Sequence, residues 1–344
     1  MHQISAPLKY LKFDGRIQIS IGFLLLPGFP MACLSSVIEP LRAANEISGQ
    51  EKFSWTLYSE DGTSVRSSAR LSFEVDGALS DVSEVDFLVV LSEPDGTFSN
   101  PQSATGKLRY LFRHGTTLCA ISGGVFPLAR SGVLDGQTCS VHWLYRTAFA
   151  AEFPQIETTD DVIAINRRSC TASGAASAFD LALHVIDAAL GESTMAEVAC
   201  WFQHSAIRNP NIRQKTPTFG TDETADHLPD NVSRAISLFS ENLEFPLTTR
   251  EVARQVGVSA RHLERSFRQA IGQSPGEYYR LLRLRAARQL VIYTQDSLTS
   301  IAHAVGYTSP TSMSRQYAEQ FGASPRQDRQ EHNRFRVTSN AFLH

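Results

Sequence analysis

The last third of the chain contains the same sequence pattern twice, at an offset of 50 residues. Residues 259–272 align with residues 309–322 without a gap, and a Ser-Pro pair follows each copy. A repeat of this length indicates that one supersecondary unit is used twice. Within each copy an apolar residue recurs every fourth position, as on one face of a helix. The paired apolar residues are Leu263 with Met313, Phe267 with Tyr317 and Ile271 with Phe321.

Each copy has the residues of two short helices separated by a glycine turn. In the first copy Thr248 and Glu251 can form a capping box that opens one helix, Gly257 ends it, and Ser259 caps the next. The second copy has the same order, with Gly306 in a turn that is one residue longer. Two helices joined in this way predict a helix-turn-helix motif, whose second helix enters the major groove of DNA.

The face of each second helix that lies opposite the apolar residues carries polar and basic side chains. Because such side chains can reach phosphates and base edges, we predict that these faces bind double-stranded DNA. The alternative is a helical domain that does not bind DNA and whose basic surface is only solvated. The repeat, the caps, the turns and the arginines together favour a DNA-binding domain. The candidate DNA-binding residues are Arg261, His262, Arg265, Arg268 and Gln269 in the first copy, and Ser309, Thr311, Ser312, Arg315 and Gln316 in the second.

Residues from about 243 to 329 resemble the DNA-binding domain of AraC/XylS-family transcription regulators. Two departures from the family pattern are Met313, where the family usually has an aromatic residue, and Pro310, which opens the second reading helix. The resemblance implies an all-α domain over residues 230–330 with two helix-turn-helix motifs joined by a rigid helix. The matching residues include Ile301-Ala302, Val305-Gly306-Tyr307, Ser314-Arg315, Phe321-Gly322 and Ser324-Pro325.

The charge of the chain is unevenly distributed. The net charge is −3, but the segment from Asp230 onward contains 15 arginines, no lysine and ten acidic residues, whereas the remainder is acidic. A basic end on an acidic body is typical of a nucleic-acid-binding domain attached to a domain with another role.

The cysteines and the apolar segments indicate where the protein works. The five cysteines are scattered, odd in number and never spaced as C-x-x-C, which argues against a disulfide framework and a structural zinc site. The apolar run at residues 17–27 is interrupted by polar residues and is too short to span a bilayer. We therefore expect a cytoplasmic protein with no metal, no other cofactor and no membrane contact, in which Cys119 is an inert apolar residue.

The first two hundred residues alternate between apolar strands and helices. This order predicts a doubly wound α/β domain with a mostly parallel sheet over residues 16–207, followed by a polar linker over residues 208–229. The expected strands are residues 17–26, 55–59, 85–91, 117–121 and 162–171, the last as a strand or a hairpin. The expected helices are residues 35–47, 104–114, 175–190 and 195–205, with a further helix that ends at residue 129.

One segment of this domain has the pattern of a nucleophile elbow. A buried strand runs directly into Ser122, Gly123 and Gly124, after which a helix begins. The pattern raises the side chain of residue 122 at the carboxyl end of the sheet, where open α/β sheets bind ligands. We therefore expect Ser122 at a ligand site, with the N–H groups of Gly123 and Gly124 available to a carboxylate.

The N-terminal region resembles the PfpI-like, class I glutamine amidotransferase-like domain, and residues 19 to 329 are similar to AraC-family regulators that carry this domain in front. Regulators of this subgroup respond to arginine, glycine betaine, carnitine and similar nitrogenous metabolites. The resemblance implies a homodimer, a small-molecule effector and RNA polymerase as a further candidate partner. The matching residues are Phe23-Leu-Leu-Leu-Pro-Gly28, Glu39-Pro-Leu-Arg-Ala-Ala-Asn45, Ala120-Ile-Ser-Gly-Gly124, Leu128-Ala129, Gly132-Val-Leu-Asp-Gly136, His142-Trp143, Phe153-Pro154 and Asp180-Leu181.

The chemistry of the elbow distinguishes a sensor from an enzyme. Catalytic relatives have a cysteine at the elbow, often followed by histidine, whereas this chain has Ser122 and Gly123. The acidic partner expected after the first strand falls at Cys33, and the His-x-Glu pair of glutaminases is missing. Because a serine without a base is a poor nucleophile, we predict a transcription regulator with a non-catalytic sensing domain. The alternatives are a hydrolase or hydratase that uses Ser122, and a domain that only forms dimers.

Four further residues are candidates for contact with the ligand. Trp143 either lines the site or fills the core, and an aromatic wall suits a quaternary ammonium group. His142 precedes it and is the one residue that could serve Ser122 as a base. Glu93 follows a buried strand at the same sheet edge as Ser122, or is a loop acid. Glu39 either contacts the ligand or is an acidic residue at a helix start.

Overall fold

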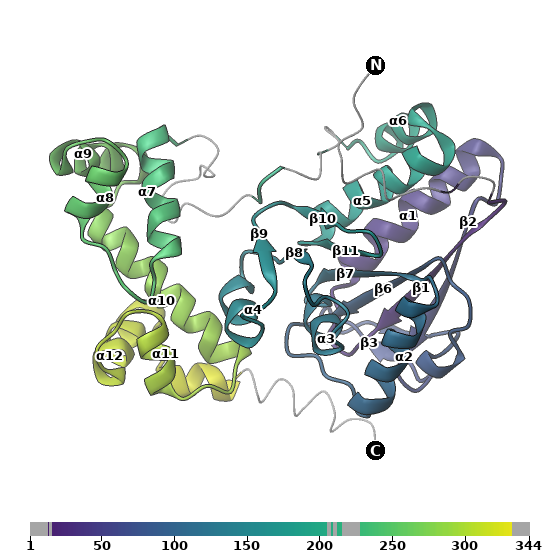
Figure 1. Cartoon of the computed structure of the whole chain (residues 1–344), viewed down its shortest axis with the longest axis horizontal. Coiled ribbons are helices and arrows are strands. Elements are labelled where there is room, and N and C mark those ends of the chain that lie inside the picture. Colours follow the sequence, from purple (N-terminus) through teal and green to yellow (C-terminus); the bar gives the residue numbers. More distant parts are fainter. Residues whose placement is uncertain (1–12, 14–15, 205–207, 209–211, 215–227, 332–344) are drawn as a thin grey trace. The chain divides into compact units, whose positions relative to one another are not determined.

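The fold was obtained as a computed structural model that describes residues 13, 16–204, 208, 212–214 and 228–331. The chain divides into two compact units, Met1–Gln214 and Lys215–His344. The first unit is an α/β domain and the second is helical (Figure 1). The predicted fold class, a doubly wound α/β domain followed by an all-α domain, is confirmed.

A seven-stranded sheet forms the centre of the first unit. Its strands are parallel, except that β10 pairs antiparallel with β11 at one edge. The strand order is β10-β11-β7-β6-β1-β2-β5, so the chain adds β2 on one side of β1 and then β6 and β7 on the other. The switch point of a doubly wound sheet is therefore next to β1. The strands are β1 (Ile19–Leu25), β2 (Phe53–Ser59), β5 (Gly77–Ala78), β6 (Phe87–Ser92), β7 (Thr117–Ser122), β10 (Ile163–Ile165) and β11 (Ser169–Ala172).

Helices cover both faces of this sheet, with α1, α5 and α6 on one face and α2 and α3 on the other (Figure 1). Two small two-stranded sheets, β3–β4 and β8–β9, lie outside the main sheet. The helices are α1 (Met31–Ser48), α2 (Pro101–Arg113), α3 (Val125–Arg130), α4 (Arg146–Glu152), α5 (Ala175–Leu190) and α6 (Glu192–Trp201). The strands outside the main sheet are β3 (Val65–Arg66), β4 (Ser72–Phe73), β8 (Thr138–Ser140) and β9 (Glu157–Thr159).

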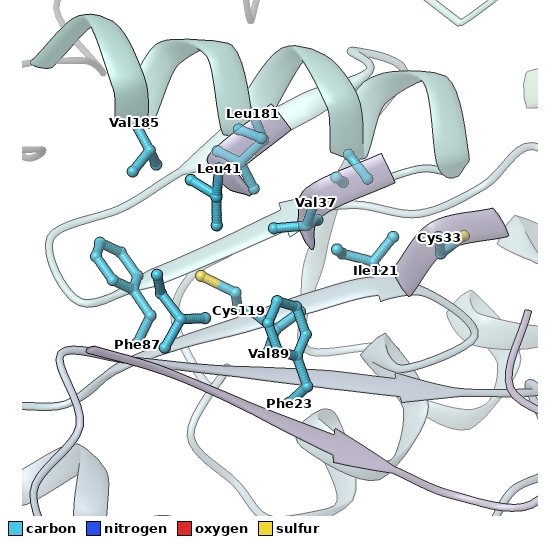
Figure 2. Packing of buried hydrophobic residues seen from close by; sticks show 14 of the residues in the cluster. Phe23, Cys33, Val37, Leu41, Phe87, Val89, Cys119, Ile121, Leu181 and Val185 are labelled. Atoms are coloured by element: carbon cyan, nitrogen blue, oxygen red, sulfur yellow. The ribbon is translucent and has the colours of Figure 1, made fainter. Parts of the chain in front are cut away.

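The core of the first unit lies between the sheet and helices α1 and α5 (Figure 2). Phe23 and Ile121 point from the sheet toward Leu41 of α1 and Leu181 of α5, and all four are buried. Burial of a side chain of this size contributes about 1.5–3 kcal/mol. This layer fixes the positions of the strand ends at which the candidate ligand site is built.

Helix α1 begins earlier than the sequence predicts. It starts at Met31, directly after Pro30, and no side chain caps its N-terminus. Glu39 and Pro40 therefore lie inside the helix, and the expectation that Glu39 marks a helix start is wrong. The misleading signal was Pro40, because proline usually occupies the first turn of a helix and is rare in the interior, where it removes a backbone hydrogen bond.

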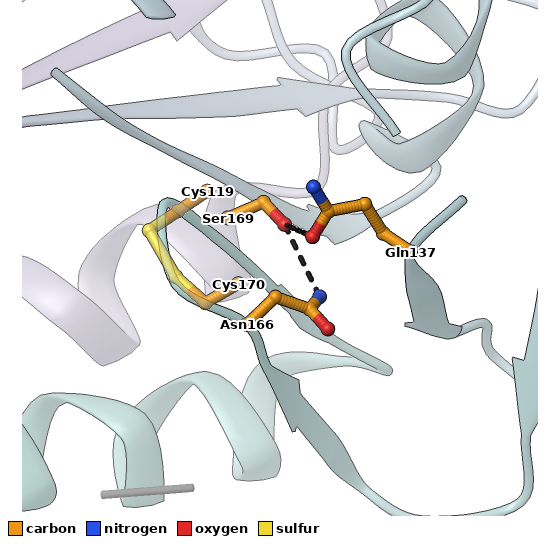
Figure 3. Close-up of a disulfide and its surroundings, with 5 residues drawn as sticks. All are labelled: Cys119, Gln137, Asn166, Ser169 and Cys170. Carbon is orange, nitrogen blue, oxygen red and sulfur yellow. Dashed lines mark hydrogen bonds between the residues drawn. A yellow bond between two sulfur atoms is a disulfide. The ribbon is translucent and has the colours of Figure 1, made fainter. Parts of the chain in front are cut away.

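The structure contains a disulfide between Cys119 and Cys170 (Figure 3), which corrects the expectation that the cysteines are unpaired. The two residues are direct partners on the neighbouring parallel strands β7 and β11, and their Cα atoms are 4.6 Å apart. This distance is suitable for a disulfide. The pairing depends on the strand order, because the cysteines are 51 residues apart in sequence. Ser169, on the other side of β11, accepts a hydrogen bond from the Asn166 amide.

The second unit contains the two predicted helix-turn-helix motifs. Helices α8 and α9 form the first, α11 and α12 form the second, and α10 joins them. The predicted capping box is present, since the N–H of Thr248 donates to the Glu251 carboxylate at 2.7 Å. Leu263 and Met313 are buried in the two second helices. The helices are α7 (Asp230–Glu241), α8 (Thr249–Gln255), α9 (Ala260–Ile271), α10 (Pro275–Tyr293), α11 (Leu298–Ala304) and α12 (Pro310–Phe321).

The end of the first unit includes residues that the sequence assigns to the linker. Arg208 is hydrogen-bonded to Asp180 of α5, and Arg213 forms a bridge with Asp161. The boundary between the two compact units lies between Gln214 and Lys215 in the sequence. The domain limits 16–207 and 230–330 stay predictions.

Candidate functional site

Ser122 lies at the sharp bend that the sequence predicts between β7 and α3. Its φ is +54°, a left-handed conformation that non-glycine residues rarely adopt, and its side chain is almost fully buried. The bend packs closely on β6, because a Cβ atom placed on Gly124 would lie 2.0 Å from the carbonyl oxygen of Val90. Only glycine fits there, so the elbow geometry is built into the fold.

The ends of three strands meet around Ser122. Ser92 at the end of β6 is the register partner of Ser122 at the end of β7. The next residue, Glu93, places its carboxylate over the turn after β1, because a Cβ atom on Gly28 would lie 2.5 Å from the Glu93 carboxyl carbon. The structure therefore brings Glu93 to the same sheet edge as Ser122.

Tyr145 contacts Ser122 directly, a contact that the sequence did not predict. The two hydroxyl groups share a hydrogen bond. Burial raises the pKa of the Tyr145 phenol, the hydrogen bond with Ser122 opposes this, and the negative charge of Glu93 and Asp95 raises it further. A phenol with a raised pKa keeps its proton at neutral pH and is a poor base for Ser122.

His142 and Trp143 lie in the loop before Tyr145. The ring centroid of His142 is 5.4 Å from that of Trp143 and 5.2 Å from that of Tyr145. Within the described part of the chain, the hydrogen bond of the His142 ring is at Nδ1, which accepts from the N–H of Leu144 at 3.2 Å, and none joins it to Ser122. Burial lowers the pKa of His142, so the imidazole is neutral at pH 7.

Cys33 stands where catalytic relatives of the fold are expected to have an acidic residue. The thiol is buried on α1, and burial raises the pKa of Cys33 to about 12. A protonated thiol can neither accept a proton nor stabilise a cationic histidine. Tyr145, which is hydrogen-bonded to Ser122, and the two groups near Tyr145, His142 and Cys33, are therefore neutral, and the negative charge close to Tyr145 comes from Glu93 and Asp95.

Two of the expected ligand-contact groups have other partners in the structure. The N–H of Gly124 donates to the carbonyl of Ile121 at 3.0 Å. This hydrogen bond corrects the expectation that the N–H of Gly124 is available to a carboxylate. The turn closes on itself, which a strand–Gly–Gly–helix pattern alone does not reveal. Glu39 forms an ion pair with Arg42 at 3.0 Å on the surface of α1, and no contact joins it to Ser122 among the described residues.

A separate cavity of about 30 Å³ lies in the apolar core between the sheet and helices α1 and α5. Leu41, Val89, Cys119 and Leu181 contribute to its walls, and Ser122 does not. This volume is about that of one water molecule. It is too small for a metabolite, so we place the candidate ligand site at the strand ends.

The candidate DNA-binding faces of α9 and α12 are partly preorganised. Arg261, Arg265 and Arg315 are exposed. The Arg265 guanidinium is 3.3 Å from Nδ1 of His262, and Arg268 pairs loosely with Glu264. Exposed guanidinium groups on one helix face can reach base edges and phosphates.

Three candidate residues of the second motif are only half-exposed, namely Ser309, Ser312 and Gln316. Their hydrogen bonds give two of them a structural role. The Ser309 hydroxyl accepts from the N–H of Ser312 at 3.3 Å and so caps the helix. The Gln316 amide oxygen accepts from the Tyr307 hydroxyl at 3.0 Å. Ser309 therefore stabilises the helix start, while Thr311 and Arg315 are fully exposed on α12.

Comparison with known proteins matches both units. A helix-turn-helix domain model matches residues 252–331, and the DJ-1/PfpI family model matches residues 29–188. The HTH-type transcriptional regulator GbdR of Pseudomonas aeruginosa is 35% identical over 314 residues, which cover 90% of this chain and 84% of GbdR. The chain belongs to this family of AraC-type transcriptional regulators with a DJ-1/PfpI-like domain.

Two further relatives are similar to this chain over most of their length. The HTH-type transcriptional regulator CdhR of Pseudomonas aeruginosa is 34% identical, with 89% of this chain and 90% of CdhR covered. The HTH-type transcriptional regulator GlxA of Rhizobium meliloti is 30% identical, with 91% of this chain and 96% of GlxA covered. The chain is therefore a DNA-binding transcriptional regulator.

The described residues contain no group of three or more His, Cys, Asp or Glu side chains that could hold a metal ion. In the same part of the chain, no helix combines the length and the apolar character that crossing a bilayer requires.

Proposed function

We propose that the α/β unit binds a small nitrogenous metabolite at the carboxyl ends of β1, β6 and β7 without converting it, and that this binding controls transcription by the helical unit. The observation that carries the proposal is the setting of Ser122. Its elbow geometry is complete, but its hydroxyl is hydrogen-bonded to the protonated phenol of Tyr145, and among the described residues no hydrogen bond joins it to the ring of His142.

The charge and the aromatic rings of the site favour a cationic ligand group. Glu93 and Asp95 supply negative charge close enough to raise the pKa of Tyr145. The rings of His142, Trp143 and Tyr145 lie next to one another in the same loop. Carboxylates together with aromatic faces suit an amine or a quaternary ammonium group. We therefore propose Ser122, Gly123, Glu93, His142, Trp143 and Tyr145 as the ligand-binding residues.

A thermal-shift screen of the full chain tests the binding proposal. We expect glycine betaine, L-carnitine or L-arginine to raise Tm, because a ligand that binds only the folded state stabilises it. Ser122→Trp should abolish the rise, whereas Ser64→Trp, at an exposed serine of the same unit, should preserve it. An equal rise in both variants would place the ligand elsewhere.

The absence of catalysis is part of the same proposal. Acyl transfer needs a nucleophile with a base in reach, and among the described residues the hydrogen-bond partner of the Ser122 hydroxyl is the protonated phenol of Tyr145. We expect no amidase, glutaminase or hydratase turnover and no labelling of Ser122 by serine-directed acylating reagents. Stoichiometric labelling of Ser122 that disappears in His142→Asn would overturn this part of the proposal.

For the helical unit, we propose that Arg265 and Arg315 read bases in two major-groove segments. They occupy equivalent positions in the two motifs, and both are exposed. Each Arg→Ala variant should weaken specific DNA binding by about 1–3 kcal/mol. Arg167→Ala, at an exposed arginine of the α/β unit, is the matched control. Unchanged affinity and salt dependence in both variants would contradict the assignment.

The remaining expectations follow from the family. A homodimer formed through the α/β unit, a cytoplasmic location and contact with RNA polymerase complete the proposal for a transcriptional regulator. Analytical ultracentrifugation of the full chain with and without DNA tests the dimer, and a purely monomeric chain on its DNA site would contradict it.

A further inference from the structure

The chain leaves the α/β unit beside the candidate ligand site. Residues 212–214 run along the segment that precedes β10, where Asp161 and Arg213 form an antiparallel bridge. The N–H of Gln214 donates to the carbonyl of Asp160 at 2.8 Å. Backbone hydrogen bonds therefore hold Gln214, the last residue of the first compact unit.

The side chain of Gln214 holds the loop that carries His142 and Trp143. Its amide oxygen accepts from the N–H of Trp143 at 2.9 Å, and its amide nitrogen donates to the carbonyl of Val141 at 2.8 Å. Both partners are backbone groups, so the side-chain amide restrains the path of the loop itself. Movement of this loop therefore either stretches these two hydrogen bonds or moves Gln214 with it.

A second attachment holds the same exit segment through α5. Asp180 is fully buried, and its carboxylate accepts from Arg208 Nε at 2.6 Å and contacts His204 Nε2 at 2.9 Å. The N-terminus of α5 lies against the ligand-site loop, because a Cβ atom on Gly174 would be 3.5 Å from the His142 ring. Both attachments of the exit segment therefore lead back to the loop around His142.

We propose that Gln214 couples the ligand site to the helical unit: its amide ties the 141–143 loop to the exit of the α/β unit, so a ligand that moves this loop changes the restraint on the chain that enters the DNA-binding unit. This inference rests on the proposed function. Gln214 is a positioning residue and does not touch the ligand. Coupling between two binding sites is commonly about 5- to 150-fold in affinity.

The contact of Tyr145 with Ser122 explains why the loop would move. Tyr145 follows this loop as the N-cap of α4 and is hydrogen-bonded to Ser122, so it covers the elbow. A ligand that reaches Ser122 displaces the Tyr145 side chain and shifts the backbone from which it projects. The N–H of Tyr145 donates to the carbonyl of His142 at 2.8 Å, which transmits the shift into the loop.

Hydrogen exchange of the full chain tests the coupling without any ligand. In Gln214→Ala, amides of residues 141–145 should exchange at least tenfold faster than in the wild type. Gln203→Ala is the matched control, since that amide donates only to the nearby carbonyl of Cys200, and exchange should not change. Ser122→Trp, which fills the site, should alter exchange of residues 212–214 at least threefold. No change in Gln214→Ala, or none at residues 212–214 in Ser122→Trp, would overturn the proposal.

A second measurement separates this inference from the proposed function. The affinity for a DNA duplex selected from a random library is measured with and without glycine betaine, L-carnitine or L-arginine. A compound that changes the DNA affinity of the wild type should raise the Tm of Gln214→Ala by at least half as much as it raises the Tm of the wild type. The change in DNA affinity that the compound causes should be at least fivefold smaller in Gln214→Ala than in the wild type. A full response in Gln214→Ala overturns the coupling and leaves the ligand site intact. If none of the three compounds raises the Tm of the wild type, the proposed effectors fail, and hydrogen exchange decides the coupling.

Discussion

Ser122 combines a strained backbone with a hydroxyl group that is hydrogen-bonded to the protonated phenol of Tyr145. Its positive φ costs about 1–2 kcal/mol for a residue with a side chain, and the close packing of Gly124 on β6 holds it there. In an enzyme such strain would present a nucleophile to a base. Here the hydroxyl is hydrogen-bonded to the protonated phenol of Tyr145, and among the described residues no hydrogen bond joins it to His142, so the strained bend can present a hydroxyl to a ligand without reacting with it.

The cysteines should differ sharply in reactivity. Iodoacetamide near pH 8 should modify Cys200 first, because it is exposed. Cys33 and Cys139 should resist, because burial raises the pKa of both thiols to about 12. The Cys119–Cys170 pair should react only after reduction and unfolding. Peptide mass spectrometry measures the order of modification. Rapid modification of Cys33 in the folded chain would contradict the burial of its thiol.

His142 should make the folded chain less stable in mild acid. Burial lowers the pKa of His142 below the value of about 6.5 that it has in the unfolded chain. The unfolded state therefore takes up the proton first, and stability falls as the pH drops below about 6.5. Urea unfolding at pH 7.5 and 5.5 should show a smaller loss for His142→Asn than for the wild type. Equal losses would mean that the imidazole is not protected from protonation.

Helices that are marked by short-range sequence features, such as N-caps and capping boxes, could be predicted from the sequence. Helix α5 has the same bounds, residues 175–190, in the prediction and in the structure. The capping box at Thr248 and Glu251 and the serine cap of α9 are also where the sequence places them. Short-range hydrogen bonds of this kind involve residues only three positions apart, so one stretch of sequence contains both partners.

The features that the sequence could not predict depend on partners far apart in the chain. The disulfide joins Cys119 to Cys170 only because β7 and β11 become neighbours. Gln214 lies in a polar stretch with no periodic signal, and its partners are more than 70 residues away. Tyr145 could have been suspected, because it extends the aromatic pair His142-Trp143, but its contact with Ser122 requires the folded sheet.

The turn of the second helix-turn-helix motif should tolerate substitution less well than the first. Gly257 and Gly306 both have a positive φ, but a Cβ atom on Gly306 would lie 2.5 Å from the Leu243 carbonyl oxygen, whereas Gly257 faces open space. Gly257→Ala should cost about 1 kcal/mol, and Gly306→Ala about 1–3 kcal/mol more. Urea unfolding followed by helical circular dichroism measures both, and equal costs would contradict the packing of this turn on the loop before α8.

The full chain joins a basic DNA-binding unit to an acidic α/β unit in which Ser122 occupies a bend with the backbone geometry of a nucleophile elbow. Regulation requires that the ligand-bound and ligand-free states of the α/β unit differ in how they restrain the helical unit. The hydrogen bonds of Gln214 to the loop at Val141 and Trp143 offer a physical route for that difference. The two units need no shared pocket for such control.

The most direct test of this account is a DNA-binding titration of the full chain with and without its ligand. Fluorescence anisotropy with a selected duplex measures Kd for the wild type, Ser122→Trp and the control Ser64→Trp. The compound is whichever of glycine betaine, L-carnitine and L-arginine raises Tm. We predict that the wild type and Ser64→Trp bind DNA equally well without it, and that the compound changes Kd at least fivefold in these two proteins but not in Ser122→Trp. A full response in Ser122→Trp would contradict it.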